Sequence, residues 1–420
     1  MELQTIMKIT FIIPDMSWLY DYKAQFSLGL LYISTILKEK GVEVSFYDTN
    51  ENDLKDIPKA DVYGFSVVFN TYDNCVDLAR QVKELRPRSK IIVGGVHATL
   101  NQYDIDPIFE SVFIGEAENT IVKFVEDFET GEFSEYYIDD KPVDLSNLIP
   151  DRKLISDDYI RTGSIFTGDQ QFDDHGSTAI MFTRGCPYKC TFCASPRVYN
   201  RQIRFRDVAS IEKEIKGIIK DYGIRQFRIQ DDTFTIKQDY LKELCDMMKP
   251  LNIFYRCSTR VNHVTEENIK NLYDSGCREI GIGIEVANDE ALKQLKKQIT
   301  VKQCEEAIRI IKKFDITLRC FFMIGTPYDT EQTMQDNIDF IERNDIDGIT
   351  CANFIPFPGT EMYDKMEDHN ISLVKKNTCM NIAKHIEFTP NIIRDDISEK
   401  DHLQIMKVFY YYIDKRGFIK

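Results

Sequence analysis

The sequence lacks the features that would direct the protein to a membrane, a nucleic acid or a secretory pathway. No apolar run approaches the roughly 18–20 residues that a membrane-spanning helix needs. Acidic residues outnumber basic ones by 68 to 53, and the formal charge of −15 argues against a broad phosphate-binding surface. The segment 1–14 has neither a basic start nor a small-residue cleavage site. We therefore expect a cytoplasmic protein that binds neither membranes nor nucleic acids.

A disulfide framework is also missing, although the chain has 11 cysteines. Their number is odd, and most of them are scattered without a regular spacing. In a long chain without an export signal, this pattern favours free thiols in a reducing compartment. The one close group, Cys186, Cys190 and Cys193, lies near the middle of the chain.

The first 128 residues alternate short β-branched segments with segments of helical periodicity. Alternating strands and helices favour a parallel sheet with helices on both faces. We therefore expect an α/β domain over 1–128 with a doubly wound, flavodoxin- or Rossmann-like sheet, whose ligands bind beyond the carboxyl ends of the strands. Gly94, Gly95 and Gly115 follow expected strands, where the backbone either approaches a ligand or simply turns. The expected strands are 8–13, 42–48, 62–68, 90–95 and 111–115, and the expected helices are 29–40, 72–86 and 118–128.

A second alternating series follows a polar stretch. The periodicity fades over 129–176, which we interpret as a linker. Six β/α units in 177–365 favour a partial (β/α)6 TIM-type barrel, whose active site would lie at the C-terminal ends of its strands. The segment 366–420 is charged and helical in pattern, and it is too short for a core of its own. The expected barrel strands are 178–183, 226–230, 254–259, 279–284, 317–324 and 348–354, and the expected helices are 208–221, 237–249, 265–275, 301–314 and 331–344.

The cysteine group follows the first expected barrel strand, where a catalytic loop belongs. In the segment 184–193 (RGCPYKCTFC), Cys186, Cys190 and Cys193 can bind three irons of a cubane cluster. Such clusters ordinarily use four cysteines, so the fourth iron is left open for chemistry. Zinc is the rival metal, but no fourth Cys or His lies nearby at a zinc-finger spacing. Three incidental cysteines in a loop are the remaining alternative.

This motif resembles the signature of the radical S-adenosylmethionine (radical SAM) superfamily. The spacing is C-x3-C-x2-C, and the aromatic Phe192 stands directly before the last cysteine. The resemblance covers about residues 178–365 and implies a 4Fe–4S cluster on the three cysteines, whose open iron chelates the amino and carboxylate groups of SAM. An electron from the cluster then cleaves a carbon–sulfur bond of SAM, which gives a deoxyadenosyl radical.

The resemblance also implies a site for the amino group of SAM after the second barrel strand. Gln230, Asp231 and Asp232 stand at the end of this strand. The two aspartates are candidates because a carboxylate complements an ammonium group. Capping of the next helix is the alternative role for Asp232.

Later strands end in segments that resemble the rest of the SAM pocket. Gly283 and Glu285 end the fourth strand, and Glu285 resembles the carboxylate that holds the ribose hydroxyls. Gly325, which follows the fifth strand, resembles the backbone on the adenine side. The segment 357–360 (FPGT) after the sixth strand is similar to that of many members with an N-terminal cobalamin-type domain.

The N-terminal domain resembles that of the cobalamin-binding class of the superfamily. The segments 29–33 (GLLYI), 94–97 (GGVH) and 115–118 (GEAE) carry this resemblance. The motif Asp-x-His-x-x-Gly, whose His binds cobalt from below, is absent, and Ser17 stands where this His would be. The resemblance therefore implies that cobalamin, if bound, has no such ligand. The expected corrin contacts are Asp15, Phe69, Gly94, Gly95 and Gly115.

Two other residues of this domain have ordinary structural explanations. His97 is a poor substitute for the missing ligand, because a lone His near a strand exit is more often a hydrogen-bonded structural residue. The single tryptophan, Trp18, either stacks on a flat ligand or packs at a domain interface.

Together these features predict a radical SAM enzyme. Cobalamin-dependent methyl transfer to a small molecule is the leading reaction, with SAM as radical source and methyl donor. A cobalamin-free enzyme that rearranges, dehydrogenates or transfers another fragment of SAM is the alternative. A cluster-bearing electron carrier or sensor is the non-enzymatic alternative. An external electron donor such as flavodoxin or ferredoxin is the expected partner, and no catalytic residue can be named.

Overall fold

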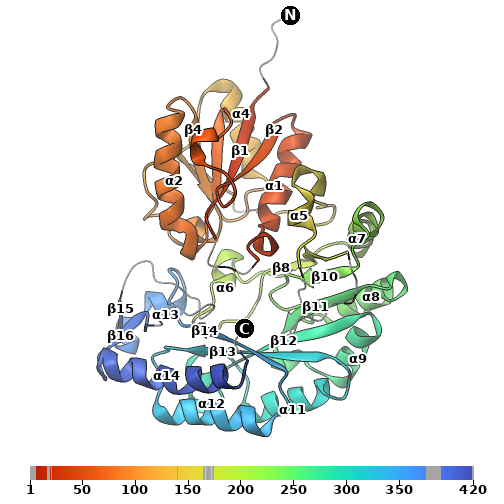
Figure 1. The fold of residues 1–420 in the computed structure, drawn as a ribbon, viewed down its shortest axis with the longest axis vertical. Helices are drawn as coiled ribbons and strands as arrows, with labels where there is room; N and C mark the ends of the chain where they lie inside the picture. The colour runs from red at the N-terminus through yellow and green to blue at the C-terminus, as the bar shows by residue number, and fades with distance from the viewer. Residues whose placement is uncertain are drawn as a thin grey trace, which may run out of the picture. The chain divides into compact units, whose positions relative to one another are not determined.

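The computed structural model divides the chain into two compact units, residues 1–160 and 161–420 (Figure 1). Ser17 and Trp18 lie outside the described residues. The described residues are 6–16, 19, 21–139, 141–163, 166, 172, 175–374 and 389–418.

Unit 1 contains one parallel sheet of six strands, in the order β2-β1-β3-β4-β5-β6. β2 lies on one side of β1, and β3 and all later strands lie on the other side, so the strand order reverses between β1 and β3. In open α/β sheets, ligands bind at such a switch point, beyond the carboxyl ends of the strands. The strands are β1 (Lys8–Ile13), β2 (Glu43–Asp48), β3 (Val62–Ser66), β4 (Lys90–Gly94), β5 (Ser111–Ile114) and β6 (Tyr136–Ile138). The helices are α1 (Leu28–Glu39), α2 (Tyr72–Leu85), α3 (Val96–Leu100), α4 (Thr120–Thr130) and α5 (Asp157–Ile160), with short 3-10 turns η1 (Lys23–Gln25), η2 (Leu54–Asp56), η3 (Phe69–Thr71) and η4 (Arg152–Leu154).

Helices cover both faces of this sheet (Figure 1). Apolar residues on each face hold them in place. On one face, α2 and α3 pack against β3 and β4, where Tyr63, Phe65 and Val93 are buried. On the other face, α1 and α4 contribute Leu37 and Phe124 to a second cluster. Because both faces are covered, the central strands are apolar along their length. The predicted doubly wound sheet is confirmed.

Unit 2 is built on a second parallel sheet, in the order β14-β13-β12-β11-β10-β7. Consecutive β/α units are neighbours in this sheet, which curls into a partial barrel with its helices outside (Figure 1). Each predicted barrel strand and helix is found, with ends that differ by at most three residues. The strands are β7 (Ser177–Ile180), β10 (Gln226–Ile229), β11 (Phe254–Thr259), β12 (Cys277–Glu285), β13 (Thr317–Ile324) and β14 (Gly348–Asn353). The outer helices are α7 (Val208–Tyr222), α8 (Gln238–Met248), α9 (Glu266–Asp274), α11 (Val301–Ile311) and α12 (Glu331–Arg343).

Smaller elements complete unit 2. A two-residue strand pair, β8 with β9, flanks the cysteine loop, and an antiparallel pair, β15 with β16, precedes the last helix. These elements are β8 (Thr183–Arg184), α6 (Ser195–Val198), β9 (Arg204–Phe205), η6 (Lys249–Leu251), η7 (Val261–His263), α10 (Asp289–Gln294), α13 (Glu361–Asp364), η8 (Glu367–His369), β15 (Ile371–Leu373), β16 (Ile392–Arg394) and α14 (Glu399–Lys415).

Two strand features lie where the sequence indicated none. β6 falls within the stretch interpreted as a linker, and it pairs with β5 as the sixth strand of unit 1. The β15–β16 pair falls within the C-terminal segment expected to be helical, of which α14 is the helical part. The limits of the predicted domains stay predictions. No helix of the described residues is long and apolar enough to cross a membrane.

Candidate active site

The cysteine loop follows the first barrel strands, and hydrogen bonds at Thr191 join it to other parts of the barrel. Gly185 has a φ of 91°, and a Cβ there would collide with the backbone oxygen of Gln202, so glycine is required directly before the first cysteine. Farther along, the Thr191 N–H donates to the Leu295 carbonyl (3.1 Å), and the Thr191 carbonyl accepts from the Met362 N–H (2.9 Å). The loop is thereby fixed to other parts of the barrel.

Two of the three cysteine thiols, Cys186 and Cys193, lie in surroundings that favour the neutral form. Cys186 and Cys190 are buried, and Cys193 is partly exposed. Burial raises the pKa of Cys186, and it raises the pKa of Cys193 to about 12 with a further contribution from its two neighbours. Thiolates at this site therefore need a cation to offset the cost of burial, and bound iron supplies one.

The donor set, three cysteine thiols on one loop, fits a cubane cluster. The charges of Cys186 and Cys190 both act on the pKa of Cys193, so the three groups are close neighbours. Yet no three His, Cys, Asp or Glu side chains among the described residues are arranged around a single metal ion. A structural zinc ion draws four ligands to one centre, whereas the cysteines of a cubane cluster bind different irons.

Arg260, which follows β11, contacts the cysteine loop directly. Its Nη1 donates to Cys190 Sγ at 3.2 Å, and its Nη2 donates to the carbonyl of Lys297. The guanidinium carbon lies 3.7 Å from the ring centroid of Tyr188. The Arg260 side chain is buried, so this contact is shielded from water.

The two aspartates after β10 differ in their surroundings. Asp231 is buried, and its two oxygens accept from the Phe182 N–H and the Thr183 hydroxyl, both at 2.8 Å. Burial raises the pKa of Asp231 to about 7. Asp232 is exposed and accepts from the Ser195 hydroxyl at 2.5 Å. Asp231 therefore joins the end of β10 to the residues that precede the cysteine loop, whereas Asp232 is accessible to solvent.

The capping alternative for Asp232 is wrong. The next helix, α8, begins at Gln238, and its N-cap residue is Lys237. Desolvation raises the pKa of Asp232 although the residue is exposed, because protein atoms surround its carboxylate at longer range. Gln230 is exposed as well, at the same end of β10.

Glu285, Gly283 and Phe192 come together around Lys297. Glu285 ends β12 with a φ of 67°, at a shift in the register between β12 and β13. Its Oε1 accepts from Lys297 Nζ at 2.5 Å, and both side chains are largely buried. A Cβ at Gly283 would collide with this ion pair, so glycine leaves the space that the pair occupies. The Phe192 ring centroid lies 5.9 Å from Lys297 Nζ.

Gly325 follows β13 in a loop that Asp329 holds. Gly325 has a φ of 81°, and a Cβ there would lie 2.8 Å from Asn353 Oδ1. Asp329 Oδ2 accepts from the N–H groups of Gly325 (2.6 Å) and Thr326 (3.2 Å). Burial raises the pKa of Asp329 to about 6, and Arg394 donates to its backbone carbonyl at 2.5 Å.

The strand exits of unit 1 present glycines and apolar side chains. Gly94 ends β4, and its carbonyl accepts from the Val67 N–H at 2.8 Å. Gly95 has a φ of 101°, and a Cβ there would lie 2.7 Å from the Val67 carbonyl oxygen. A Cβ at Gly115, whose φ is 78°, would have no atom within 4 Å, so no neighbouring side chain fills the space beside this residue. The exposed Val68 and Val96 lie at the same sheet edge. An apolar edge with accessible backbone fits a large flat ring such as a corrin.

His97 is a buried structural residue. Its ring stacks on Tyr72, with centroids 4.0 Å apart, and the half-buried Phe69 lies 5.8 Å away. Burial lowers the pKa of His97 to about 4. The neutral, stacked ring agrees with the structural role expected for it.

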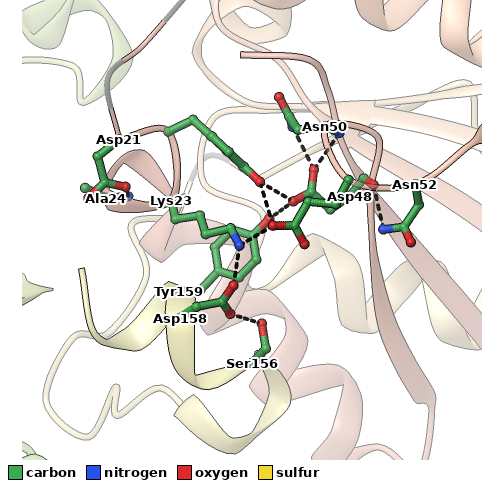
Figure 2. Close-up of polar contacts among 11 residues, drawn as sticks. Asp21, Lys23, Ala24, Asp48, Asn50, Asn52, Ser156, Asp158 and Tyr159 are labelled. Carbon is green, nitrogen blue, oxygen red and sulfur yellow. Dashed lines mark hydrogen bonds and ion pairs between the residues drawn. The ribbon is translucent and has the colours of Figure 1, made fainter. Parts of the chain in front are cut away.

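A polar network holds the neighbouring exit of β1 and β2 (Figure 2). Asp48, the last residue of β2, accepts from the hydroxyls of Tyr22 and Tyr159. The side chain of Asn50 accepts from the Met16 N–H (2.7 Å) and donates to the Pro14 carbonyl (2.9 Å). The exposed Asp15 lies between these two anchored residues, so its backbone position is set by the network.

Two family models match the chain. The radical SAM superfamily model matches residues 180–341, which include the cysteine loop, and the B12 binding domain model matches residues 24–125. The chain is a radical SAM enzyme with a B12 binding domain. The predicted superfamily and class are confirmed, and the two domains imply a 4Fe–4S cluster, SAM and cobalamin as cofactors.

Known proteins similar to this radical SAM enzyme include methyltransferases. It is 25% identical to an uncharacterized methyltransferase of Pyrococcus horikoshii, over 94% of this chain and 89% of the relative. It is 28% identical to the bacteriochlorophyllide d C-12(1)-methyltransferase of Chlorobaculum tepidum, over 81% of this chain and 74% of the relative. The structure of the radical SAM methyltransferase TsrM from Kitasatospora setae, with cobalamin and a [4Fe-4S] cluster bound, matches with a TM-score of 0.66 and 14% identity, over 94% of this chain and 84% of TsrM. The likeness to TsrM shows a shared fold.

The radical SAM barrel also contains three charged residues that the sequence analysis missed. Arg260, Lys297 and Asp329 reach their partners through tertiary contacts, and Arg260 is 70 residues away from Cys190 along the chain. Lys297 stands in a lysine-rich segment typical of an exposed surface. Of the three, only Asp329 could have been found from the local sequence. It follows Gly325 closely, and Asp side chains commonly accept hydrogen bonds from backbone N–H groups in turns.

Proposed function

We propose that this enzyme is a cobalamin-dependent methyltransferase that acts on a small molecule. The observation that carries the proposal is the pairing, in one chain, of a cysteine loop on a radical SAM barrel with a B12 binding domain. The two relatives from Pyrococcus horikoshii and Chlorobaculum tepidum support methyl transfer, since both are named as methyltransferases. The B12 binding domain also favours methyl transfer over a cobalamin-free radical reaction.

In this proposal, Cys186, Cys190 and Cys193 hold the cluster through three thiolates. When bound, the cluster and SAM supply the radical chemistry, and cobalamin carries the methyl group. The hydrogen bonds of Thr191 to Leu295 and Met362 would help to keep the loop in place before metal binds. Phe192 contributes an aromatic wall beside the last cysteine.

The SAM pocket would lie along the ends of β10, β12 and β13. Asp232 is the better candidate for the amino group of SAM, because the oxygens of Asp231 already accept two hydrogen bonds. Gln230 lies at the same strand end. Glu285 would bind the ribose hydroxyls, and its ion pair with Lys297 orients the carboxylate.

Two glycines complete the proposed SAM pocket. Gly283 leaves space beside Glu285, and Gly325 would present its backbone to the adenine. The buried Asp329 positions that backbone, since it accepts from the Gly325 N–H. At both glycine positions a Cβ would collide with neighbouring side chains, the Glu285–Lys297 pair at Gly283 and Asn353 at Gly325, so both positions need glycine.

Cobalamin would lie against the carboxyl edge of the sheet in unit 1. Its proposed contacts share this edge and combine an accessible backbone with an aromatic ring and one carboxylate. His97 would not bind cobalt, because its ring is buried and stacked on Tyr72. The proposed contacts are Asp15, Phe69, Gly94, Gly95 and Gly115.

We further propose a reducing cytoplasm as the compartment and an external electron donor, such as flavodoxin or ferredoxin, as the partner. The ten cysteines of the described residues are all free thiols, which suits a reducing environment. Reductive cleavage of SAM consumes an electron, so a donor protein must supply it.

Anaerobic absorption spectroscopy tests the proposed cofactor set. The protein is purified without oxygen, reconstituted with iron and sulfide, and titrated with hydroxocobalamin. We expect iron–sulfur absorbance before the titration and one cobalamin per chain after gel filtration. Full SAM turnover and product formation by protein free of cobalamin would contradict cobalamin-dependent methyl transfer.

A further inference from the structure

Arg260 brings a fixed positive charge against one of the three cysteines. Its Nη1 lies 3.2 Å from Cys190 Sγ, within hydrogen-bonding distance for a sulfur acceptor. Two further contacts hold the guanidinium, the carbonyl of Lys297 and the ring of Tyr188. The position of the charge is therefore set by the barrel and by the loop together.

This charge has no carboxylate as its partner within the described residues, whose contacts to Arg260 are a sulfur, a carbonyl and an aromatic ring. The side chain is 6% exposed, and its Nε–H is buried without a hydrogen-bond partner in the described part of the chain. A buried cation without a counterion is costly. An anionic group at the cysteine loop would offset this cost, and a thiolate-ligated cluster is anionic.

We infer that Arg260 raises the reduction potential of the cluster bound by Cys186, Cys190 and Cys193. The inference rests on the proposed cluster site. On reduction, the cluster accepts one electron from an external donor, and no covalent bond forms or breaks. The reduced cluster is more negative by one charge, so a fixed cation stabilises the reduced form more than the oxidised form.

The hydrogen bond acts in the same direction as the charge. Donation from Nη1 draws electron density from the Cys190 sulfur, and hydrogen bonds to cluster sulfurs are among the factors that set the potential. Because the contact is buried, water screens it little. Arg260 is therefore a residue that tunes the cluster and makes its reduction by a donor protein easier.

Redox titration of matched variants tests the inference. Arg260→Gln removes the charge and keeps a hydrogen-bond donor, whereas Arg260→Lys keeps the charge and loses the planar fork. Arg309→Gln removes the same charge from the exposed surface of α11 and is the control. Iron content and absorbance are measured first, and the reduced cluster is then titrated by electron paramagnetic resonance without SAM.

We expect the equilibrium constant for reduction to fall at least tenfold in Arg260→Gln, which corresponds to about 59 mV for a one-electron couple. Arg260→Lys should recover part of this loss, and Arg309→Gln should match the wild type. If Arg260→Gln does not assemble the cluster, the test uses Arg260→Lys alone. The reduction potential of the cluster in Arg260→Lys must then lie below that of the wild type.

Other results would overturn the inference. The inference fails if Arg260→Gln binds a full cluster and has the wild-type reduction potential. If only Arg260→Lys assembles the cluster, an unchanged reduction potential in that variant would also overturn the inference. Weaker SAM binding at an unchanged potential would instead assign Arg260 to SAM. A wild-type protein that binds no cluster at all would contradict the proposed function itself, and the inference about Arg260 would fall with it.

Discussion

At the scale of single residues, the barrel site depends on charges that are buried and paired. Glu285 has a positive φ, a strained conformation for a residue with a side chain, which costs about 1–3 kcal/mol. Such strain persists where the surroundings hold the residue in place, and the ion pair with Lys297 does so here. The strain and the pairing both favour a role in binding.

We expect Glu285→Gln to weaken SAM binding while the cluster still assembles. A hydrogen bond from a hydroxyl to a charged group contributes about 1.5–3 kcal/mol, so the Kd for SAM should rise about 10- to 150-fold. Anaerobic equilibrium dialysis with labelled SAM measures this change, and iron content reports the cluster. Glu243→Gln, on the exposed face of α8, is the control. Unchanged SAM affinity in Glu285→Gln would remove the ribose assignment.

His97 should make the stability of the protein depend on pH. Its pKa is about 4 in the folded protein, below the ordinary 6.5, so the unfolded chain binds this proton first as the pH falls. Stability is therefore lost between about pH 6.5 and 4, by up to about 3 kcal/mol from this residue. In urea unfolding across this range, His97→Gln should show a shallower loss of stability than the wild type. Parallel pH profiles for His97→Gln and the wild type would be the contrary result.

At the scale of elements, the barrel strands were predictable because each short segment contains buried apolar residues and a helical segment separates it from the next strand. β6 was not predicted, since only Tyr137 of its three residues is buried and no periodicity can appear. The cysteine loop was predictable because its chemistry lies in local spacing. The contacts of Lys297 with Glu285 and of Arg260 with Cys190 join separate elements, so local patterns could not indicate them.

The loop after β13 depends on Asp329, and its loss should destabilise the barrel. Asp329→Ala would leave the buried N–H groups of Gly325 and Thr326 without their acceptor, at a cost of about 2–3 kcal/mol. The melting temperature should fall by roughly 5–10 °C. Calorimetry compares this variant with Asp345→Ala, whose side chain is exposed and which should melt as the wild type does. Equal melting temperatures for all three proteins would show that the loop does not need this carboxylate.

At the scale of the whole molecule, the chain joins a B12 binding domain to a radical SAM domain. The sequence predicted both, because each repeats strands and helices over a long range and the cysteine motif is specific. Ser17, which we expect to stand where the class motif has its cobalt-binding His, lies outside the described residues, and the buried His97 is engaged with Tyr72.

Bound cobalamin should consequently lack a protein imidazole on its lower face. The electron paramagnetic resonance spectrum of bound Co(II) should show no splitting from a histidine nitrogen. His97→Gln should leave this spectrum unchanged. Nitrogen splitting that disappears in His97→Gln would instead identify His97 as a cobalt ligand.

The most direct measurement of the central claim follows the cluster and SAM cleavage in one variant. In the triple variant Cys186→Ala, Cys190→Ala and Cys193→Ala, reconstituted under anaerobic conditions, we expect iron–sulfur absorbance and the reductive release of 5′-deoxyadenosine from SAM to be lost together. The wild type, treated in parallel with the same reductant, should retain both. Full iron content or continued SAM cleavage in a folded triple variant would contradict the assignment of the cluster to these cysteines.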